Sequence, residues 1–347
     1  MSLEILATGP LTTVQDMGRQ GYGKLGYRRC GACDKYAMQL ANILAGNVED
    51  SDRAAVLEFT LSGGKLRFME NAVFAVTGAQ MPLKLDGTSV SMYQPVIAEA
   101  GQILELGFAM KGLRSYLAVG GGLKLPLVLE SCSTDSTCGV GGLEGRALKP
   151  GDVLKTTAVE ENRSLSRYKK DIQGRETEFQ ITEDQFWLRH PSYPYRSVGS
   201  QLLPVLRVVP GPQEEAFTEA GRETLWRGVY RLTSDSNRMA CRLEGPVLET
   251  KTGSDIISDG IVEGSVQVAA NGLPMVMLAD HQTTGGYAKI GTVISPDISA
   301  IAQCRPGDCV GFQYITPEEA GEAYRKEVRK LEWLKKEIAT KRKNPQR

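Results

Sequence analysis

Polar side chains gather beside a pair of glycines between Asp280 and Lys289. Glycines let backbone N–H groups approach a ligand closely, and a lysine neutralises negative charge. Two threonine hydroxyls with a lysine therefore favour a cradle for a carboxylate, or for an oxyanion that develops during a reaction. The same pattern also fits a polar β-turn that binds nothing. The candidate catalytic residues are Thr283, Thr284 and Lys289, and Tyr287 is a candidate substrate-binding residue.

Three other segments, residues 13–19, 234–246 and 259–268, place charged or amide side chains next to turns. Polar groups on loops often bind ligands, but oppositely charged neighbours also pair without any further role. In this second interpretation Arg238 or Arg242 forms a salt bridge with Glu244. The candidate substrate-binding residues from these segments are Gln15, Asp16, Arg19, Arg238, Glu244 and Gln267.

Three short motifs are incomplete versions of known sites. Residues 18–25 have the Gly and Lys spacing of a phosphate loop, but Leu25 stands where a magnesium-binding hydroxyl is needed. Cys30 and Cys33 form a single CxxC without the four ligands of a structural zinc site, so two ordinary thiols are the alternative. Lys111 follows Ala-Met as a biotin-acceptor lysine does, but no small biotinyl domain surrounds it. We predict no metal site and no biotin on this chain.

The composition excludes several classes of protein. Lys plus Arg and Asp plus Glu both number 41, so the formal net charge is zero, whereas nucleic-acid-binding proteins carry a basic excess. No stretch reaches the roughly 20 apolar residues that cross a bilayer. The first residues lack the pattern of a signal peptide, and seven scattered cysteines favour reduced thiols. We expect a cytoplasmic protein that binds neither nucleic acid nor membrane.

Short β-rich runs broken by glycines make up most of the chain before Thr316. Helical patterns interrupt them at 34–46, which Gly46 closes, and at 212–228. The sequence therefore predicts a mainly β fold with short helices.

A weak repeat divides the chain in two. The Pro-Gly-Asp turn of 147–154 recurs in 303–310, which indicates two similar halves or a coincidence of a common turn. We predict a first domain at 1–160, a polar linker or excursion at 161–200, a second domain at 201–316 and a basic helical tail at 317–347.

The tail has the clearest local signals. Thr316, Pro317 and Glu319 form a capping box with proline at the first helical position. An apolar stripe at helical spacing follows, which indicates a docked amphipathic helix. Binding to a partner or a membrane is the alternative, because the tail is rich in lysine and arginine. The stripe consists of Tyr324, Val328, Leu331, Leu334 and Ile338.

A series of motifs in a fixed order resembles the allophanate-hydrolase subunit 2 family, also called the biotin-dependent carboxyltransferase-like family. The resemblance runs from about residue 5 to 315. It implies a fold of two cyclophilin-like β-barrel domains. The motifs include TVQDMGRQGYG, GACDKYAMQLANILAGN, FAVTGAQ, GLRSYLAVGGG, LRVVPGPQEEAF, SDSNRMACRLEGP and ADHQTTGGYAKI.

The resemblance also implies a function. A free-standing chain of this length is similar to the C subunit of ATP-dependent 5-oxoprolinases, which opens 5-oxoproline to glutamate together with the A and B subunits. In that case ATP binds mainly on a partner chain of the complex, and this chain is inactive alone. Two alternatives stay open: a non-catalytic antagonist of a kinase inhibitor that is homologous to the B subunit, and the carboxyltransferase half of a biotin-dependent, urea-carboxylase-like enzyme.

Overall fold

The computed structural model describes residues 2–156 and 193–343. The chain divides into two compact units, each made of separate stretches of sequence. The first unit comprises Met1–Gln20, Cys30–His190 and Arg329–Arg347, and the second comprises Gly21–Arg29 and Pro191–Val328. The domain limits drawn from the sequence stay a prediction, and most of the expected linker lies outside the described residues.

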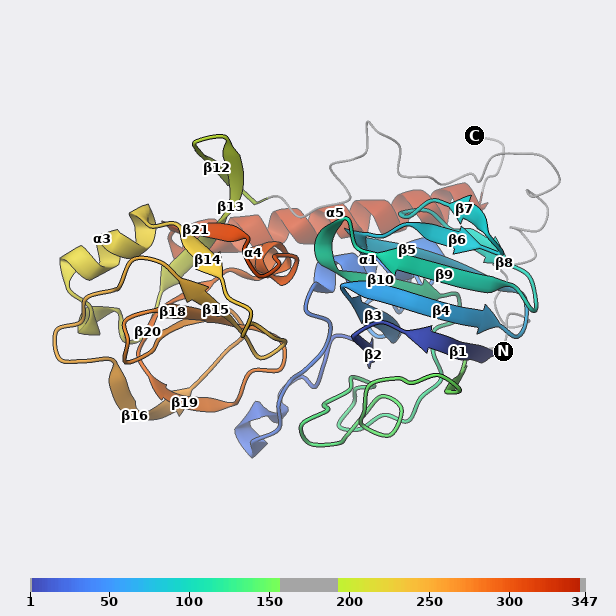
Figure 1. Cartoon of the computed structure of the whole chain (residues 1–347), viewed down its shortest axis with the longest axis horizontal. Helices are drawn as coiled ribbons and strands as arrows, with labels where there is room; N and C mark the ends of the chain where they lie inside the picture. Colours follow the sequence, from blue (N-terminus) through green and yellow to red (C-terminus); the bar gives the residue numbers. More distant parts are fainter. Residues whose placement is uncertain (1, 157–192, 344–347) are drawn as a thin grey trace. The chain divides into compact units, whose positions relative to one another are not determined.

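The first unit contains two antiparallel sheets (Figure 1). The six-stranded sheet has the order β11 (Val153–Lys155), β1 (Ser2–Thr8), β4 (Ser62–Phe68), β9 (Ile103–Phe108), β6 (Leu83–Leu85) and β7 (Thr88–Val90). The five-stranded sheet has the order β2 (Leu11–Gln15), β3 (Val56–Thr60), β10 (Lys111–Val119), β5 (Ala72–Gln80) and β8 (Val96–Ala98).

The five-stranded sheet is buried on both faces. Successive side chains of a strand point to opposite faces, so Leu57 and Leu117 enter the core shared with the six-stranded sheet. Their neighbours Val56 and Tyr116 face the other way, into a second core formed with α1 (Lys35–Ala45). This explains why these strands carry few exposed polar residues.

Helix α1 has its predicted ends. The Asp34 carboxylate caps it by accepting the Ala37 N–H at 3.0 Å. Gly46 closes it in the left-handed conformation, with φ 101°. The helix predicted at 34–46 is confirmed.

The second unit is a closed seven-stranded barrel. The strands follow the order β13 (Gln201–Pro210), β20 (Lys289–Val293), β17 (Ser265–Val268), β18 (Pro274–Met277), β15 (Ala240–Glu244), β14 (Tyr230–Leu232) and β21 (Cys309–Tyr314), and β21 pairs with β13 in parallel. Strand β12 (Tyr195–Val198) extends β13 outside the barrel. A separate ribbon pairs β16 (Asp255–Gly260) with β19 (Thr284–Tyr287) (Figure 1). The predicted mainly β fold class is confirmed.

The prediction of a single helix at 212–228 is wrong. The segment forms a short 3-10 turn at Glu214–Ala216 and then α3 (Glu219–Arg227). Between them Phe217 is extended and fully buried in the barrel core, and Thr218 caps the new helix by accepting the Gly221 N–H. Burial of one aromatic ring therefore interrupts the helical pattern. A further helix, α4 (Ser295–Ala302), was not predicted.

The repeated Pro-Gly-Asp turn has the same local structure in both places. Asp152 accepts the backbone N–H of Lys149 at 2.9 Å, and Asp308 accepts that of Arg305 at 2.8 Å. The following strands differ, because β11 pairs antiparallel with β1 whereas β21 runs parallel to β13. The turn is thus a shared local motif in two different pairings.

Helix α5 (Pro317–Lys343) begins with the predicted capping box, in which Thr316 and Glu319 exchange side-chain-to-backbone hydrogen bonds of 2.8 and 3.3 Å. The later part of its stripe, from Leu331 on, is buried against α1, whereas Tyr324 and Val328 are exposed. Within the described residues, no helix has the length and apolar character of a membrane span.

Replacing Leu334 tests how strongly α5 stabilises the first unit. Leu334 is almost fully buried, so Leu334→Ala should lower the free energy of unfolding by about 3 kcal/mol through lost contacts and a cavity. Urea denaturation followed by tryptophan fluorescence measures this. Lys336→Ala, on the exposed face, is the control and should change stability by less than about 0.5 kcal/mol. Equal effects would contradict docking of the helix.

Candidate functional site

Lys289 is the centre of a polar cluster in the second unit. Its side chain is 3% exposed, and its ammonium group donates to Asp259 Oδ2 at 2.7 Å and to the Gly260 carbonyl at 3.0 Å. An ammonium group has three N–H donors. One donor therefore has no partner within the described part of the chain and is available to a ligand.

Asp259 orients this lysine and compensates its charge. Its carboxylate also accepts a hydrogen bond from Gln213 Nε2 at 3.1 Å, and Gln213 Oε1 accepts the backbone N–H of Lys289. The hydrogen bond from Lys289 is the main reason that the pKa of Asp259 falls to about 2, with smaller effects from Gln213 and the Gly260 N–H. The cluster is thus a lysine–aspartate pair, a pairing that the sequence did not indicate.

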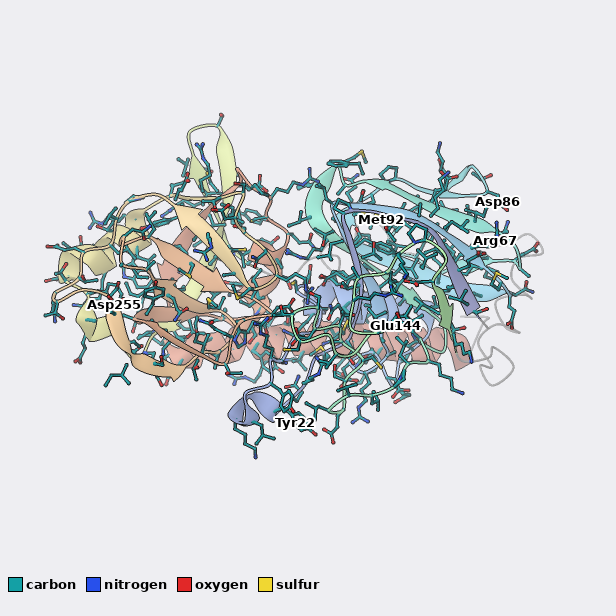
Figure 2. The ribbon with its side chains drawn as sticks, turned by 60° about the horizontal axis from the view of Figure 1, so that its bottom comes forward. Tyr22, Arg67, Asp86, Met92, Glu144 and Asp255 are labelled. Atoms are coloured by element: carbon teal, nitrogen blue, oxygen red, sulfur yellow. The ribbon has the colours of Figure 1, made fainter. Side chains whose placement is uncertain are left out.

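Gln267 lies beside Lys289. The two residues are partners across strands β17 and β20, so their side chains share a face. Gln267 is buried, and its amide donates to the Tyr287 carbonyl at 3.3 Å. A Cβ on Gly285 would lie 3.0 Å from that amide and 2.6 Å from Ile261 Cδ1, so a larger residue there would have to move these side chains. Tyr287 ends β19, half exposed, opposite Asp255, which Figure 2 labels.

Thr283 and Thr284 lead into the β16–β19 ribbon. The Thr283 carbonyl accepts the Ile261 N–H at 3.0 Å, and Thr284 pairs with Gly260, whose carbonyl holds Lys289. Both side chains are at least partly exposed, and neither hydroxyl has a hydrogen bond within the described residues. The structure therefore connects three of the predicted residues, Thr283, Thr284 and Lys289, through one strand pair.

Arg238 pairs with Asp280 and not with Glu244. Its guanidinium holds the Asp280 carboxylate with two hydrogen bonds of 2.8 and 2.9 Å, and both side chains are largely buried. Glu244 is exposed at the end of β15, opposite Arg231. The predicted pairing of Glu244 with Arg238 is thus corrected, because a carboxylate on the turn after β18 reaches the arginine in this geometry.

The three remaining candidates lie in the first unit, and all are buried. The Asp16 carboxylate accepts four hydrogen bonds, from the Gly18 and Cys132 N–H groups and from the Ser131 and Ser133 hydroxyls. Asp16 therefore fixes the 131–133 segment and has little capacity left for a substrate. Gln15 donates to Thr13 and, at 3.4 Å, to the Thr134 carbonyl.

Next to Asp16, the thiol of Cys132 is held in its neutral form. Burial, and then the negative charge of Asp16, raise the pKa of Cys132 to about 11, although Arg19 partly opposes this. Only the thiolate is a strong nucleophile, so Cys132 does not serve as one at neutral pH.

The three incomplete motifs lie in the following local structures. Residues 18–25 contain only a four-residue 3-10 turn, Tyr22–Leu25 (Tyr22 is labelled in Figure 2), where a phosphate loop needs an α-helix. Cys30 and Cys33 are both buried. Lys111 opens β10 within the first unit's sheet. Among the residues described, no three His, Cys, Asp or Glu side chains come together as metal ligands.

Three residues of these clusters were not predicted, and Asp259 was noted in the polar segment 259–268 without its pairing to Lys289. They are far in sequence from their partners: Gln213 and Asp259 bind Lys289 from 76 and 30 residues away, and the two serines bind Asp16 from more than 100 residues away. The PGPQ turn before the 3-10 segment was the only local signal for Gln213. The missed residues are Gln213, Ser131 and Ser133.

Comparison with known proteins gives consistent matches. The model of the carboxyltransferase domain, subdomain A and B, matches residues 25–314. The C subunit of the 5-oxoprolinase of Escherichia coli (strain K12) is 38% identical over 332 residues, which cover 96% of this chain and 97% of that protein. The C subunit of the Haemophilus influenzae 5-oxoprolinase is 36% identical over 339 residues, covering 98% and 99%.

A solved structure shares the fold. The crystal structure of the K. lactis urea amidolyase matches with a TM-score of 0.80 at 26% identity and covers 96% of this chain. This chain spans only 20% of the amidolyase. It is thus similar to one region of a much longer protein and to nearly the whole of both bacterial subunits.

Titration of Asp259 tests the lysine–aspartate pair. Because its pKa in the folded chain, about 2, lies below the unfolded value of about 3.9, the pair stabilises the fold above about pH 4. This contribution disappears as the pH falls towards 2. In Lys289→Met the pKa of Asp259 should rise towards about 3.9, as measured by NMR of the carboxyl carbon. Lys251→Met, a change of an exposed lysine, should leave it unchanged.

Removal of Asp280 tests the corrected ion pair. Asp280→Ala leaves the buried Arg238 without its carboxylate, so the free energy of unfolding should fall by about 3 kcal/mol. Glu244→Ala is the matched control and should cost less than about 0.5 kcal/mol. Chemical denaturation of both variants measures the difference. A larger loss in Glu244→Ala would restore the pairing expected from the sequence.

Proposed function

Because this chain belongs to the carboxyltransferase subdomain A and B family, we propose that it works as the C subunit of a 5-oxoprolinase. Such an enzyme opens the cyclic amide of 5-oxoproline to give glutamate. The proposal is supported by similarity to two bacterial C subunits along nearly their full lengths. It includes two partners, the A and B subunits, without which this chain is inactive, and a cytoplasmic location.

The single observation that carries the chemistry is the Lys289 ammonium group, which is buried, oriented by Asp259 and left with one open N–H donor within the described residues. In ring opening, the oxygen of water bonds to the lactam carbonyl carbon, the C–N bond breaks, and the released nitrogen gains a proton. Negative charge develops on the carbonyl oxygen. A fixed donor in a site poor in water stabilises such charge strongly.

The residues around Lys289 complete the proposed site. The Thr283 and Thr284 hydroxyls bind the substrate carboxylate or the developing oxyanion, because they have no partner of their own among the described residues. Gln267 and Tyr287 position the substrate. Arg238, held by Asp280, keeps the turn before Thr283 in place. Asp259 fixes the orientation of the Lys289 ammonium group.

The described residues contain no complete phosphate loop for ATP. The only candidate within the described residues, 18–25, has neither the magnesium-binding hydroxyl nor the helix of such a loop. We therefore propose that ATP binds mainly on a partner chain of the complex and that this chain carries no biotin.

The experiment is to reconstitute the complex. This chain, co-expressed with homologues of the A and B subunits from the same genome, should release glutamate and ADP from 5-oxoproline, and omission of this chain should abolish release. Lys289→Met should lower kcat at least roughly 100-fold, as the loss of an oxyanion donor does. The matched control Lys251→Met, on the exposed surface, should stay within about twofold.

Other outcomes decide between the alternatives. Equal glutamate release without this chain, together with binding to the B subunit, would support the regulatory antagonist. Transfer of CO2 to urea when a biotin carboxylase and its biotinyl protein are supplied would support the carboxyltransferase, to which the similarity with urea amidolyase points.

A further inference from the structure

Arg19 is a buried cation without a counter-ion in the described chain. Its side chain is 2% exposed, and the one hydrogen bond that it makes there, from Nη2 to the Ser133 carbonyl at 2.6 Å, is to a neutral group. The Nε and Nη1 atoms have no hydrogen-bond partner. Within residues 2–156 and 193–343, no carboxylate lies at ion-pair distance from it.

Such an arrangement is unfavourable unless a ligand completes it. Arginine side chains stay charged in proteins and are rarely fully buried without a carboxylate or phosphate. Elsewhere in this chain Arg238 follows that rule by pairing with Asp280. Asp16 lies close enough to act on the same thiol as Arg19. Its carboxylate, however, is directed to four neutral donors and does not pair with the guanidinium.

The backbone around Arg19 is built to hold it there. A Cβ on Gly141 would lie 2.4 Å from Arg19 Nη2 and 2.0 Å from the Ser133 carbonyl, and Gly141 has φ +71°. Only glycine is compatible with that position. Gly141 lies in the same loop as Glu144, which Figure 2 labels.

The turn before the serines is strained. Leu129 and Glu130 both have positive φ, 53° and 61°, a conformation that costs a residue with a side chain roughly 1–2 kcal/mol. Such outliers are concentrated at ligand sites. The 128–134 segment is therefore fixed in a costly conformation by Asp16, and Arg19 lies against it.

We infer that Arg19 binds the carboxylate group of a small molecule in the first unit. A planar guanidinium matches a carboxylate, to which it donates two parallel hydrogen bonds. The site offers one positive charge, which suits a monoanion better than a phosphate dianion. Gln15 adds a second feature, because its Oε1 is buried without a partner while its Nε2 reaches the Thr134 carbonyl, next to Ser133. An acceptor there favours a carboxylate ligand that also carries an N–H group.

Carboxylate binding at Arg19 requires neither Lys289 nor catalysis, so it is tested on the full chain alone. Calorimetric titrations at constant sodium chloride would use acetate, 5-oxo-L-proline, inorganic phosphate, and 2-pyrrolidinone, which is the same lactam without its carboxylate. We expect 5-oxo-L-proline to bind more tightly than acetate, and 2-pyrrolidinone to show no binding. Tighter binding of phosphate than of either carboxylate would overturn the choice of ligand.

Variants separate a binding role from a structural one. Arg19→Met should weaken carboxylate binding by roughly 100-fold, the size expected for a lost pair of charged hydrogen bonds, while the melting temperature of the ligand-free chain stays the same or rises. Arg19→Lys should restore part of the binding, because the charge is kept and the fork is lost. Arg53→Met, which changes an exposed arginine of the same unit, should bind as the unchanged chain does.

A measurement on the unchanged chain covers the case in which Arg19→Met fails to fold. The Nε–H NMR signal of Arg19 should shift on saturation with acetate or 5-oxo-L-proline, whereas the signal of Arg53 should not. No shift at Arg19, or binding that survives in Arg19→Met, overturns the inference. A lower melting temperature of ligand-free Arg19→Met with unchanged affinity would assign Arg19 to structure alone.

Discussion

The cost of placing a charge away from water determines where the polar side chains of this chain lie. In the second unit Arg207 binds Asp297, which is fully buried, through its backbone N–H and its guanidinium, at 2.7 and 2.6 Å. Burial raises the pKa of Asp297, and the hydrogen bond from Arg207 opposes that rise. The pair attaches α4 to β13. The Lys289 and Arg238 pairs obey the same constraint.

That constraint changes the chemistry expected of Lys289. A lone cation would attract any anion, but a lysine already paired with Asp259 attracts anions weakly and offers directional donation from its remaining N–H. Half of the Asp259 side chain is exposed, at 51%, so an entering ligand meets the aspartate as well as the lysine. The site is therefore suited to a group that is neutral when it arrives and becomes negative as it reacts, such as an amide carbonyl.

Local patterns were sufficient for much of the fold. The Gly46 stop and the capping box at Thr316 depend on residues within four positions of each other, and both appear as predicted. The predictions from sequence failed where a contact between residues far apart in the chain determines the local structure. Phe217 is not helical because its ring is buried in the barrel core. Arg238 pairs with Asp280, although Glu244 is nearer in sequence, because β15 and β18 lie side by side. The candidate site residues stay predictions, and their partners, 30 to 117 residues away, have no signature in the local sequence.

Arg19 is informative because it departs from the rule that a buried charge is paired with an opposite one. Its neighbour Asp16 could have been its partner, yet that carboxylate is committed to Ser131, Ser133 and two backbone N–H groups. Had Asp16 paired with Arg19, the 131–133 segment would lose the acceptor that fixes it, and the charge of the guanidinium would be compensated within the chain. In the structure, four neutral donors bind the Asp16 carboxylate instead. The charge of Arg19 is therefore not compensated by a carboxylate of the described residues. Because no carboxylate of the described residues compensates this charge, the carboxylate ligand that we infer would supply the opposite one.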